Sequence, residues 1–337
     1  MDIDLKVLKT IESDRGIAFT ELVEIIEAAI LAAYYRSEDI HLKRDEVDYT
    51  RAVLDKQTGV VHIFTRDKDE AGQPVGEERD VTPENFGRIA ASSAKQVIMQ
   101  RLRAINDENL LGEFTGKVGD IVIGTIQQGT RAYMINVDLG SLEAQLPPEE
   151  QVVGEEYTHG KRIRVIITKV DKGSRGGPMV TVSRRHKNLV RKLFALEVPE
   201  IASGQVEIMQ VAREAGHRTK IAVKATVAGL NAKGACIGPL GARVRAVSAE
   251  LNEEKIDIVD YDDDIKKFVA AALSPAKISA TFTIPSKDPD GRVHVRALVP
   301  DYQLSLAIGK EGQNAKLAAD LTGAKIDIQP ESILEGE

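Results

Sequence analysis

The strongest constraint on how this chain folds is an internal repeat towards its C-terminal end. The segment CIGPLGARVRAV aligns with AIGKEGQNAKLA, which lies 71 residues further along the chain. Their glycines correspond in pairs, Gly238 with Gly309 and Gly241 with Gly312, and each segment leads through helix-forming residues into the same four residues, KIDI. A single glycine pair is common by chance, but a repeated glycine pair, helix and strand predicts two copies of one supersecondary unit.

The sequence before each glycine pair repeats as well. The first copy is preceded by a predicted helix (KNLVRKLFALEV), two strands (VEIMQVARE and TKIAVKA) and a short helix. The second is preceded by a helix (DIKKFVAAAL), two strands (KISATFTI and RVHVRALV) and a short helix (QLSLAI). Each unit is thus predicted to run helix, strand, strand, helix, glycine loop, helix, strand. That order, αββααβ, resembles the type II KH domain of bacteria, which binds single-stranded RNA.

The two loops of the form Gly-x-x-Gly suit a nucleic-acid backbone. Glycines let the chain turn tightly and approach a ligand without an intervening Cβ, and each loop opens a helix whose N-terminal N–H groups attract phosphate. Such a loop clamps about four nucleotides against an apolar groove, for which Ile237, Val244 and Ile308 are the candidates. The candidate RNA-binding residues are Gly238, Pro239, Leu240, Gly241, Arg243, Arg245, Gly309, Lys310, Glu311, Gly312, Gln313, Asn314 and Lys316.

Among these residues the arginines and lysines are candidate phosphate partners, and Gln313 and Asn314 are candidate readers of base edges. For each side chain, a solvated helix face or a packed core position is an equally good interpretation. Pro239 and Leu240 leave the first loop with backbone N–H groups as its main phosphate contacts. Glu311 gives the second loop a charge of the same sign as phosphate, which its basic neighbour has to offset.

Composition and charge narrow the functional classes. The chain carries a formal charge of −7, and residues 1–114 alone carry −8, so this acidic part suits a protein partner better than RNA. Aromatic residues make up only 4% and tryptophan is absent, which disfavours binding by rows of stacked aromatics. A single cysteine, Cys236, excludes an intramolecular disulfide. No apolar run approaches the ~20 residues of a membrane span, and the N-terminus does not resemble a secretory signal. We therefore expect a cytoplasmic protein without membrane contact.

Residues 1–114 are predicted to form a mixed α/β domain. The segment TELVEIIEAAILAAYYR has helical spacing with Thr20 as its N-cap, and residues 47–67 alternate on either side of QTG as a hairpin does. A long helix of about eight turns is expected to begin with Thr82 as N-cap and Pro83 at its first position. It is long enough to bridge to a second domain.

Residues 115–185 contain about five short strands punctuated by glycines, a pattern typical of a small closed barrel of the OB type. Such barrels bind single-stranded nucleic acid in some proteins and only protein in others. Basic residues at positions 161, 162, 164, 184 and 185 favour nucleic acid. The order GDIVIGTI, LGSLEAQLP, GKRIRV and VSRR resembles the S1 RNA-binding domain.

An acidic N-terminal domain followed by an S1 domain and two KH domains resembles the NusA family of bacterial transcription factors. The resemblance covers the whole chain and is sharpest in SRRHKNLVRKLFALEVPEI, VAREAGHRTKIAV, GACIGPLGARVRAV, EKIDIVDYDDD, ALSPAKI, VPDYQLSLAIGKEGQNAKLAADLTG and KIDI. It implies an α+β multidomain chain with an α/β RNA polymerase-binding domain (1–114), a five-stranded S1 barrel (115–185), a first KH domain (186–275) and a second KH domain (276–337).

The resemblance also implies a function. The N-terminal domain is expected to bind RNA polymerase near the RNA exit channel while the S1 and KH domains hold single-stranded nascent RNA. The chain then regulates pausing, termination and antitermination, together with other Nus factors, without being an enzyme and without a cofactor or metal. The chain ends soon after the second KH unit, so the acidic C-terminal repeats of some family members, which mask the RNA surface, are expected to be missing and RNA binding to need no unmasking.

Two rival interpretations stay open. An enzyme is disfavoured because the sequence contains no GxxxxGK[ST], GxGxxG, CxxC or HExxH motif. The acidic run at 260–264 suits a divalent metal, but capping of the helix that begins near Ile265 is the favoured explanation. Polynucleotide phosphorylase carries KH and S1 domains in the opposite order, with catalytic domains for which this chain has no room. The second rival is a ribosome-associated or RNA-chaperone KH protein that acts without polymerase, and the RNA modules alone do not separate it from a transcription factor.

Overall fold

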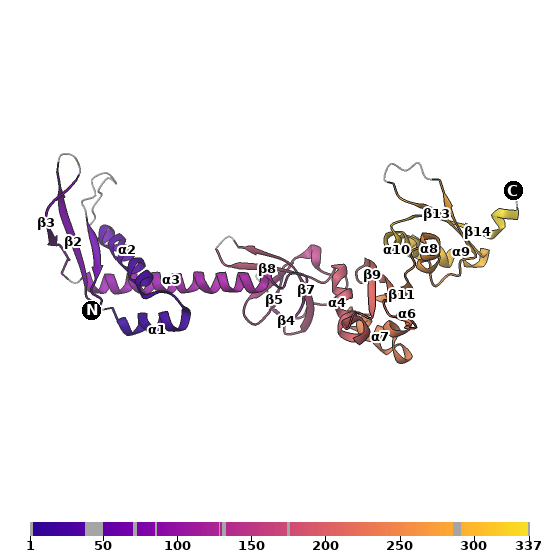
Figure 1. Ribbon diagram of the computed structural model, residues 1–337, viewed down its shortest axis with the longest axis horizontal. Coiled ribbons are helices and arrows are strands. Elements are labelled where there is room, and N and C mark those ends of the chain that lie inside the picture. The colour runs from indigo at the N-terminus through magenta and orange to yellow at the C-terminus, as the bar shows by residue number, and fades with distance from the viewer. Residues whose placement is uncertain are drawn as a thin grey trace. The chain divides into compact units, whose positions relative to one another are not determined.

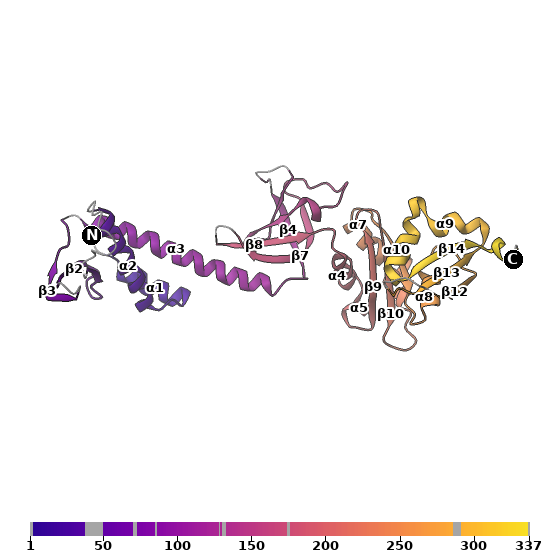
Figure 2. The ribbon, with the colours of Figure 1, turned by 90° about the horizontal axis from the view of Figure 1, so that it is seen from above.

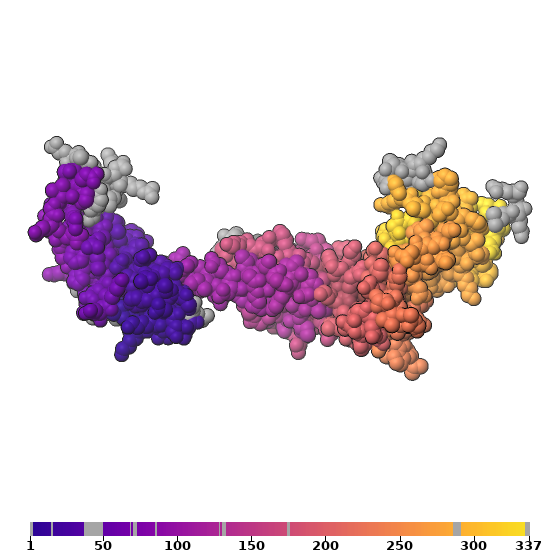
Figure 3. All heavy atoms as spheres, viewed as in Figure 1, coloured from indigo at the N-terminus to yellow at the C-terminus, as the bar shows by residue number. Residues whose placement is uncertain are grey.

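The computed structural model describes residues 3–37, 50–69, 73–84, 86–127, 129, 133–173, 176–285 and 291–335. Figure 3 colours the described part of the surface by residue number. The chain divides into two compact units, one made up of residues 1–110 and 174–177 and the other of residues 111–173 and 178–337. Each unit has its own hydrophobic core.

The first unit combines helices with a three-stranded antiparallel sheet of order β1-β2-β3. Its elements are α1 (Leu5–Arg15), α2 (Phe19–Ser37), β1 (Arg51–Leu54), β2 (Val61–Lys68), β3 (Pro74–Asp80) and α3 (Phe86–Thr115), and all of them except β1 are labelled in Figures 1 and 2. Leu22, Ile26 and Ile30 of α2 lie at helical spacing and are fully buried together with Ile63 of β2. The predicted hairpin around QTG is confirmed as β1–β2, and its predicted positions 47–49 lie outside the described residues.

Both predicted N-caps in this unit are wrong, because each helix begins at another residue. Helix α2 begins at Phe19, one residue before Thr20, and the N–H of Phe19 donates to Glu12 Oε1 at 2.9 Å. Helix α3 begins at Phe86 instead of beside Thr82, whose hydroxyl oxygen accepts a backbone N–H of β2 at 2.8 Å. The predicted length of α3 is confirmed, since its 30 residues make about eight turns.

The second unit begins with a closed five-stranded barrel, as predicted. Its strands are β4 (Ile121–Gln127), β5 (Ile135–Asp138), β6 (Glu143–Leu146), β7 (Arg162–Lys172) and β8 (Pro178–Ser183), in the order β4-β5-β6-β8-β7. Side chains at alternate positions, such as Val165, Ile167 and Val182, are fully buried and fill the barrel. Strand β5 approaches β4 so closely that a Cβ at Gly124 would lie 2.3 Å from Val137 Cγ1.

Two repeats follow the barrel, and their elements come in the same order apart from a short additional helix, α5, in the first. The first repeat consists of α4 (Lys187–Glu197), α5 (Pro199–Ala202), β9 (Val206–Glu214), β10 (Arg218–Ala225), α6 (Ala232–Ile237), α7 (Ala242–Glu250) and β11 (Lys255–Asp260). The second consists of α8 (Ile265–Ala272), β12 (Ala280–Ile284), β13 (His294–Val299), α9 (Leu304–Ile308), α10 (Gln313–Thr322) and β14 (Lys325–Pro330). In each sheet the first two strands pair antiparallel and the third pairs parallel with the second. The predicted αββααβ order is thus confirmed in both repeats.

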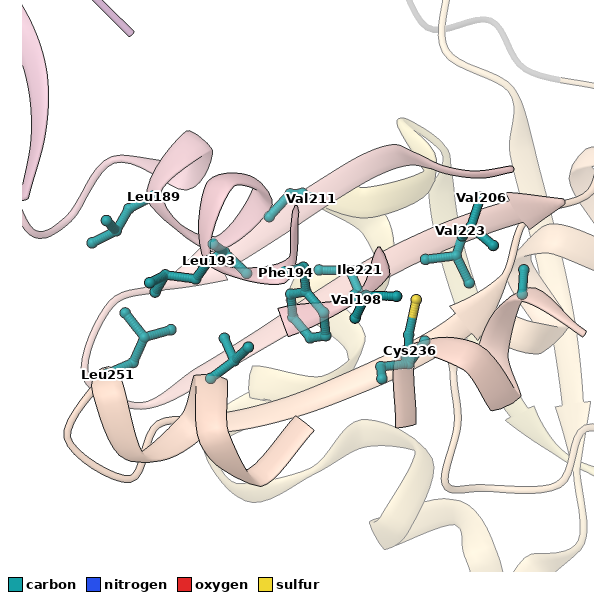
Figure 4. Packing of buried hydrophobic residues seen from close by; sticks show 14 of the residues in the cluster. Leu189, Leu193, Phe194, Val198, Val206, Val211, Ile221, Val223, Cys236 and Leu251 are labelled. Atoms are coloured by element: carbon teal, nitrogen blue, oxygen red, sulfur yellow. The ribbon is translucent and has the colours of Figure 1, made fainter. Parts of the chain in front are cut away.

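The core of the first repeat brings its helices onto one face of its sheet. Phe194 of α4, Ile221 of β10, Cys236 of α6 and Leu251 after α7 belong to a single buried cluster (Figure 4). Burial raises the pKa of the Cys236 thiol to about 11. The cysteine is therefore packed as a small apolar side chain and is not a reactive thiolate.

The other face of the same sheet is covered by the second repeat, so that the two repeats share a core. Ala212, Ala222 and Val259 of the first repeat pack with residues of α8 and α10 that include Phe268 and Leu317. Alanine side chains allow helices to approach a sheet closely. The sheet of the first repeat is therefore buried on both faces.

Lys220 fixes the junction between the repeats. Its side chain is fully buried on the face that the second repeat covers, and its ammonium donates to Asp257 Oδ2 at 2.9 Å and to the carbonyl oxygen of Ser274 at 2.8 Å. Burial lowers the pKa of the Lys220 ammonium, and the Asp257 carboxylate opposes that shift. The bond to Ser274 ties the first sheet to the segment that follows α8.

A buried arginine joins the barrel to the first repeat. Arg184, which follows β8, is 2% exposed and donates to Glu155 through Nε at 3.0 Å and through Nη2 at 2.5 Å. It also donates to the carbonyl oxygens of Arg164 at 2.8 Å and Glu250 at 2.7 Å. The Glu155 carboxylate is itself buried and accepts the hydroxyl of Tyr157. All three donor nitrogens of Arg184 are thus used inside the protein.

A buried carboxylate holds the β9–β10 turn of the first repeat. Glu254 accepts hydrogen bonds from the guanidinium of Arg213, from the hydroxyl of Thr219 and from the N–H of Gly216 at 2.9 Å. Burial raises the pKa of the Glu254 carboxyl, but these donors and the charge of Arg213 outweigh it, so the pKa lies below its usual value of 4.5.

Candidate nucleic-acid interface

The two Gly-x-x-Gly loops have matching backbone conformations despite their different sequences. The first glycine has φ and ψ of 74° and 174° at Gly238, and of 78° and 170° at Gly309. The third residue is left-handed in both loops, with 51° and 23° at Leu240 and 54° and 24° at Glu311. Left-handed backbone is disfavoured for residues other than glycine, so the surrounding structure imposes this shape on both loops.

The last glycine of each loop starts the following helix from a left-handed position. Gly241 has φ and ψ of 77° and 17°, and Gly312 has 74° and 8°. The N–H of each donates back to the carbonyl oxygen of the first glycine, at 3.0 Å from Gly241 to Gly238 and 3.1 Å from Gly312 to Gly309. A glycine at the N-cap has no side chain with which to cap its helix. The N-terminal N–H groups of α7 and α10 therefore face the loop surface, where an anion can bind.

The loop side chains themselves point into solvent. Leu240 is 94% exposed, and Pro239, Lys310 and Glu311 are exposed too. Arg245 is exposed and donates from Nη1 to the carbonyl oxygen of Leu240, so its guanidinium lies beside the first loop. These residues are placed where the sequence predicted a contact with RNA.

Arg243, predicted to bind phosphate, is engaged inside the protein. Its Nη1 donates to Glu200 Oε2 at 2.9 Å and to the carbonyl oxygen of Ala235 at 2.7 Å. The N–H of Glu200 itself and the Arg243 guanidinium lower the pKa of the Glu200 carboxyl. The guanidinium is therefore neutralised by a carboxylate, which weakens its case as a phosphate ligand.

The prediction that Asn314 reads base edges is wrong, because its side chain is fully buried. Its Nδ2 donates to the carbonyl oxygens of Leu273 at 3.0 Å and Ala307 at 2.9 Å. The neighbouring Gln313 donates to Glu214 Oε2 of β9 at 2.7 Å and so bridges the two repeats. The Asn314 amide is therefore not presented to a ligand, whereas Gln313 is half-buried and uses its Nε2 for this bridge.

Lys316 is exposed. It lines a cleft of about 420 Å³ together with Arg185 from the end of the barrel and with Arg213 and His217 from the first repeat. Asp320 lines the same cleft. The cleft is of mixed charge, so Lys316 has an anion nearby as well as cations.

The candidate groove residues differ between the repeats. Ile237 and Val244 are half-buried and pack against the core of the first repeat. Ile308 is 38% exposed, and Leu306, which the sequence analysis missed, is 47% exposed. Leu306 aligns with Ala235 of the first repeat. The larger apolar side chain at this repeat position is the sequence feature that could have identified Leu306 as a groove candidate. The second repeat therefore offers the more open apolar surface beside its loop.

The basic residues of the barrel only partly serve as a free cationic surface. Arg184 is buried and Arg164 forms an ion pair with Glu250 of α7. Arg185 donates to the carbonyl oxygen of Glu149. Part of this positive charge therefore holds the barrel and the first repeat together.

The acidic run before α8 caps that helix, as favoured from the sequence. Asp264 is the N-cap and accepts the N–H of Lys266 at 3.0 Å, while Asp263 pairs with Lys224 at 2.8 Å. Among the described residues, no group of three or more histidine, cysteine, aspartate or glutamate side chains is arranged to hold a metal ion. In the same part of the chain, no helix is long and apolar enough to cross a membrane.

Comparison with known protein families gives three matches along the chain. Residues 184–261 match the model of the NusA-like first KH domain, residues 265–335 that of the NusA-like second KH domain, and residues 66–108 that of the NusA N-terminal domain. The second of these matches begins at residue 265 and so includes α8, which the predicted boundary at residue 275 assigns to the first KH domain.

Similar proteins extend over nearly the whole chain. The transcription termination/antitermination protein NusA of Mycobacterium tuberculosis is 53% identical over 336 residues, which cover 98% of this chain and 93% of that protein. The protein of the same name from Bacillus subtilis is 41% identical over 350 residues, covering 97% and 91%. That from Thermus thermophilus is 35% identical over 355 residues, covering 98% and 90%. With its barrel, its paired repeats and these relatives, the chain belongs to the NusA family of transcription termination/antitermination proteins, which are transcription factors and not enzymes.

Proposed function

We propose that this chain regulates transcriptional pausing, termination and antitermination by binding RNA polymerase through residues 1–114 and single-stranded nascent RNA through residues 115–337. The observation that supports this most directly is the pair of loops with matching backbone angles, in a chain that resembles NusA proteins along its length. The RNA-binding part would consist of the S1 barrel (115–185) and the KH domains (186–275 and 276–337). We assign the chain to the cytoplasm, with other Nus factors as further partners.

The two loops share one backbone conformation but present different side chains to RNA. In the second loop, Lys310 supplies a cation for phosphate beside the anionic Glu311, and Ile308 and Leu306 provide an exposed apolar surface for a base. In the first loop, Leu240 presents an apolar side chain to a base or sugar, and phosphate would meet backbone N–H groups and the guanidinium of Arg245 beside the loop.

The intrinsic affinity for RNA is expected to be modest. Residues 115–337 carry a net charge of only +1, since the whole chain carries −7 and residues 1–114 carry −8. Phosphate-dominated affinity falls steeply as salt rises. Binding to polymerase compensates by holding the RNA-binding domains next to the emerging transcript, which raises the effective RNA concentration.

The first unit suits a protein partner. Its negative charge repels nucleic acid, and an apolar groove of about 500 Å³ between α1 and α3 is lined by residues that include Val7, Leu8, Ile98 and Leu102. Grooves of this kind accept the apolar face of a partner helix. We assign this groove to a segment of RNA polymerase.

The alternative is a ribosome-associated or RNA-chaperone protein, because the same RNA modules serve both functions. A tagged fragment of residues 1–114 is incubated with core RNA polymerase, and the full chain is assayed for pause duration on a template with a pause hairpin. We expect the fragment to retain polymerase and the full chain to lengthen the pause. If the fragment retains no polymerase while the full chain binds RNA and co-sediments with ribosomes, the alternative holds.

A further inference from the structure

Two residues at equivalent positions make equivalent contacts in the two repeats. Arg243 and Asn314 each lie two residues after the last glycine of a loop. Each side chain reaches back across the loop and donates to a carbonyl oxygen of the helix before it, at 2.7 Å from Arg243 to Ala235 and 2.9 Å from Asn314 to Ala307. The two side chains differ in size and charge, but they close the loop in the same way.

The second contact of each side chain goes to the helical segment that precedes the first strand of its repeat. Arg243 donates at 2.9 Å to the carboxylate of Glu200 in α5, the short helix that follows α4. Asn314 donates at 3.0 Å to the carbonyl oxygen of Leu273, the C-cap of α8. In both repeats one side chain therefore links the helix before the loop, the helix after it and the helical segment before the first strand.

The first glycine of each loop leaves room for this side chain. A Cβ at Gly238 would lie 2.6 Å from Arg243 Cγ, and a Cβ at Gly309 would lie 2.8 Å from Asn314 Cβ. These distances are far below van der Waals contact. The need for glycine at this position thus comes from the closing side chain as well as from the positive φ.

We propose that Arg243 and Asn314 are positioning residues, here called latch residues, that hold each loop in its RNA-binding conformation and do not themselves bind RNA. This inference rests on the proposed RNA-binding function. Leu240 and Glu311 occupy a left-handed conformation that is disfavoured for such residues, so the loop shape has to be maintained by other contacts. When a latch residue is replaced, a smaller fraction of the molecules has the loop in its RNA-binding conformation. The apparent affinity for RNA falls in proportion to that fraction.

A substitution at Glu200 distinguishes a latch role of Arg243 from direct binding of phosphate by Arg243. If Arg243 bound phosphate, removing the carboxylate that neutralises it would strengthen RNA binding. If Arg243 is a latch, removing Glu200 loosens the loop and weakens binding, although a negative charge has been taken away from the RNA surface. The two roles thus predict opposite signs for the same substitution.

The test uses the full chain and a fluorescein-labelled single-stranded RNA of mixed sequence, with fluorescence anisotropy measured at several KCl concentrations. The variants are Glu200→Ala, Arg243→Ala, Arg243→Lys and Asn314→Ala, with Glu207→Ala as control because Glu207 is an exposed carboxylate of the same repeat. Glu200→Ala and Arg243→Ala are expected to weaken binding by about tenfold, the scale of one charge-assisted hydrogen bond. The dependence on salt should stay unchanged, Arg243→Lys should restore most of the affinity, and Glu207→Ala should not weaken binding.

The proposal is overturned if Glu200→Ala leaves affinity unchanged or tightens it. It is also overturned if Arg243→Ala lowers the slope of log K against log salt by about 0.7, the loss expected for one phosphate contact on a single strand. Asn314 is buried, so thermal melting accompanies its variant, and a variant that melts like wild type yet binds RNA equally well contradicts the latch in the second repeat. Failure of the wild-type chain to bind RNA would instead refute the proposed function.

Discussion

The buried arginine between the barrel and the first repeat makes a sharp prediction for stability. Replacing Arg184 by methionine keeps most of the side-chain volume but removes every side-chain donor. The carboxylate of Glu155, 4% exposed, then keeps only the hydroxyl of Tyr157 as a side-chain donor. The carbonyl oxygens of Arg164 and Glu250 lose their bonds to the guanidinium as well.

The size of the effect follows from leaving a buried charge without its partner. Removing one member of a buried ion pair costs about 3–5 kcal/mol. For a unit of this size, each kcal/mol lowers the melting temperature by roughly 2–4 °C, so Arg184→Met is expected to lower the transition of the second unit by roughly 6–20 °C. The double variant Arg184→Met with Glu155→Gln should regain part of this loss, because no charge then stays buried.

Differential scanning calorimetry of the full chain measures these shifts, with Arg162→Met as the control because Arg162 is an exposed residue of β7. The control should melt within about 2 °C of wild type. The reasoning is refuted if Arg184→Met also melts within that range. It is refuted equally if the double variant is destabilised by the sum of the two single changes, since the charge of Glu155 would then play no part.

Three further predictions concern the first repeat's buried carboxylate and the second loop. Because the folded pKa of Glu254 lies below 4.5, its stabilising contribution is present above that pH and is lost as the pH falls through the folded pKa. Glu254→Gln should therefore flatten the acid dependence of the melting temperature below pH 4.5, and an unchanged acid dependence would contradict this account. Lys310→Asp combined with Glu311→Asp should weaken RNA binding at matched salt without changing the melting temperature, and equal affinity would mean that the second loop is not a contact. Gly309→Ala should weaken RNA binding more than Gly312→Ala, because an added Cβ meets the latch residue at the first site and nothing within 4 Å at the second; the opposite order in an anisotropy titration would refute this.

The order of elements could be predicted from the sequence because each repeat acts as a control for the other. Helical and strand periodicities are ambiguous in short segments, but the same succession occurs twice around the glycine pairs. The barrel was predictable for a related reason, since five short strands separated by glycines have few other ways to bury their apolar faces.

Side-chain roles after the loops could not be predicted, because they depend on partners far away in the sequence. Arg243 and Asn314 lie on helices next to glycine loops, where a cation and an amide suggest a ligand. The structure instead gives Arg243 a carboxylate 43 residues earlier and gives Asn314 a carbonyl 41 residues earlier. The one indication in the sequence that Arg243 and Asn314 have the same structural role was their alignment at one repeat position. Their different side-chain chemistry concealed this role.

Charge was a misleading guide in the barrel for the same reason. Arg184 follows a strand in a basic stretch, which favoured a nucleic-acid surface. Its side chain instead donates to the carbonyl oxygen of Glu250, which lies 66 residues later. The predicted start of α3 was wrong for a more local reason. The hydroxyl of Thr82 had a backbone N–H of β2 within reach, and that bond replaced the predicted N-cap.

The shared core of the two repeats fixes the distance between their two Gly-x-x-Gly loops. Since α8 and α10 complete the burial of the first repeat's sheet, and Lys220 ties that sheet to the segment after α8, one loop cannot shift relative to the other without exposing apolar surface. On the proposed function, an RNA that binds both loops has to present its two contacted segments at this fixed distance. An RNA with one extra nucleotide between those segments would have to bulge that nucleotide out or release one loop.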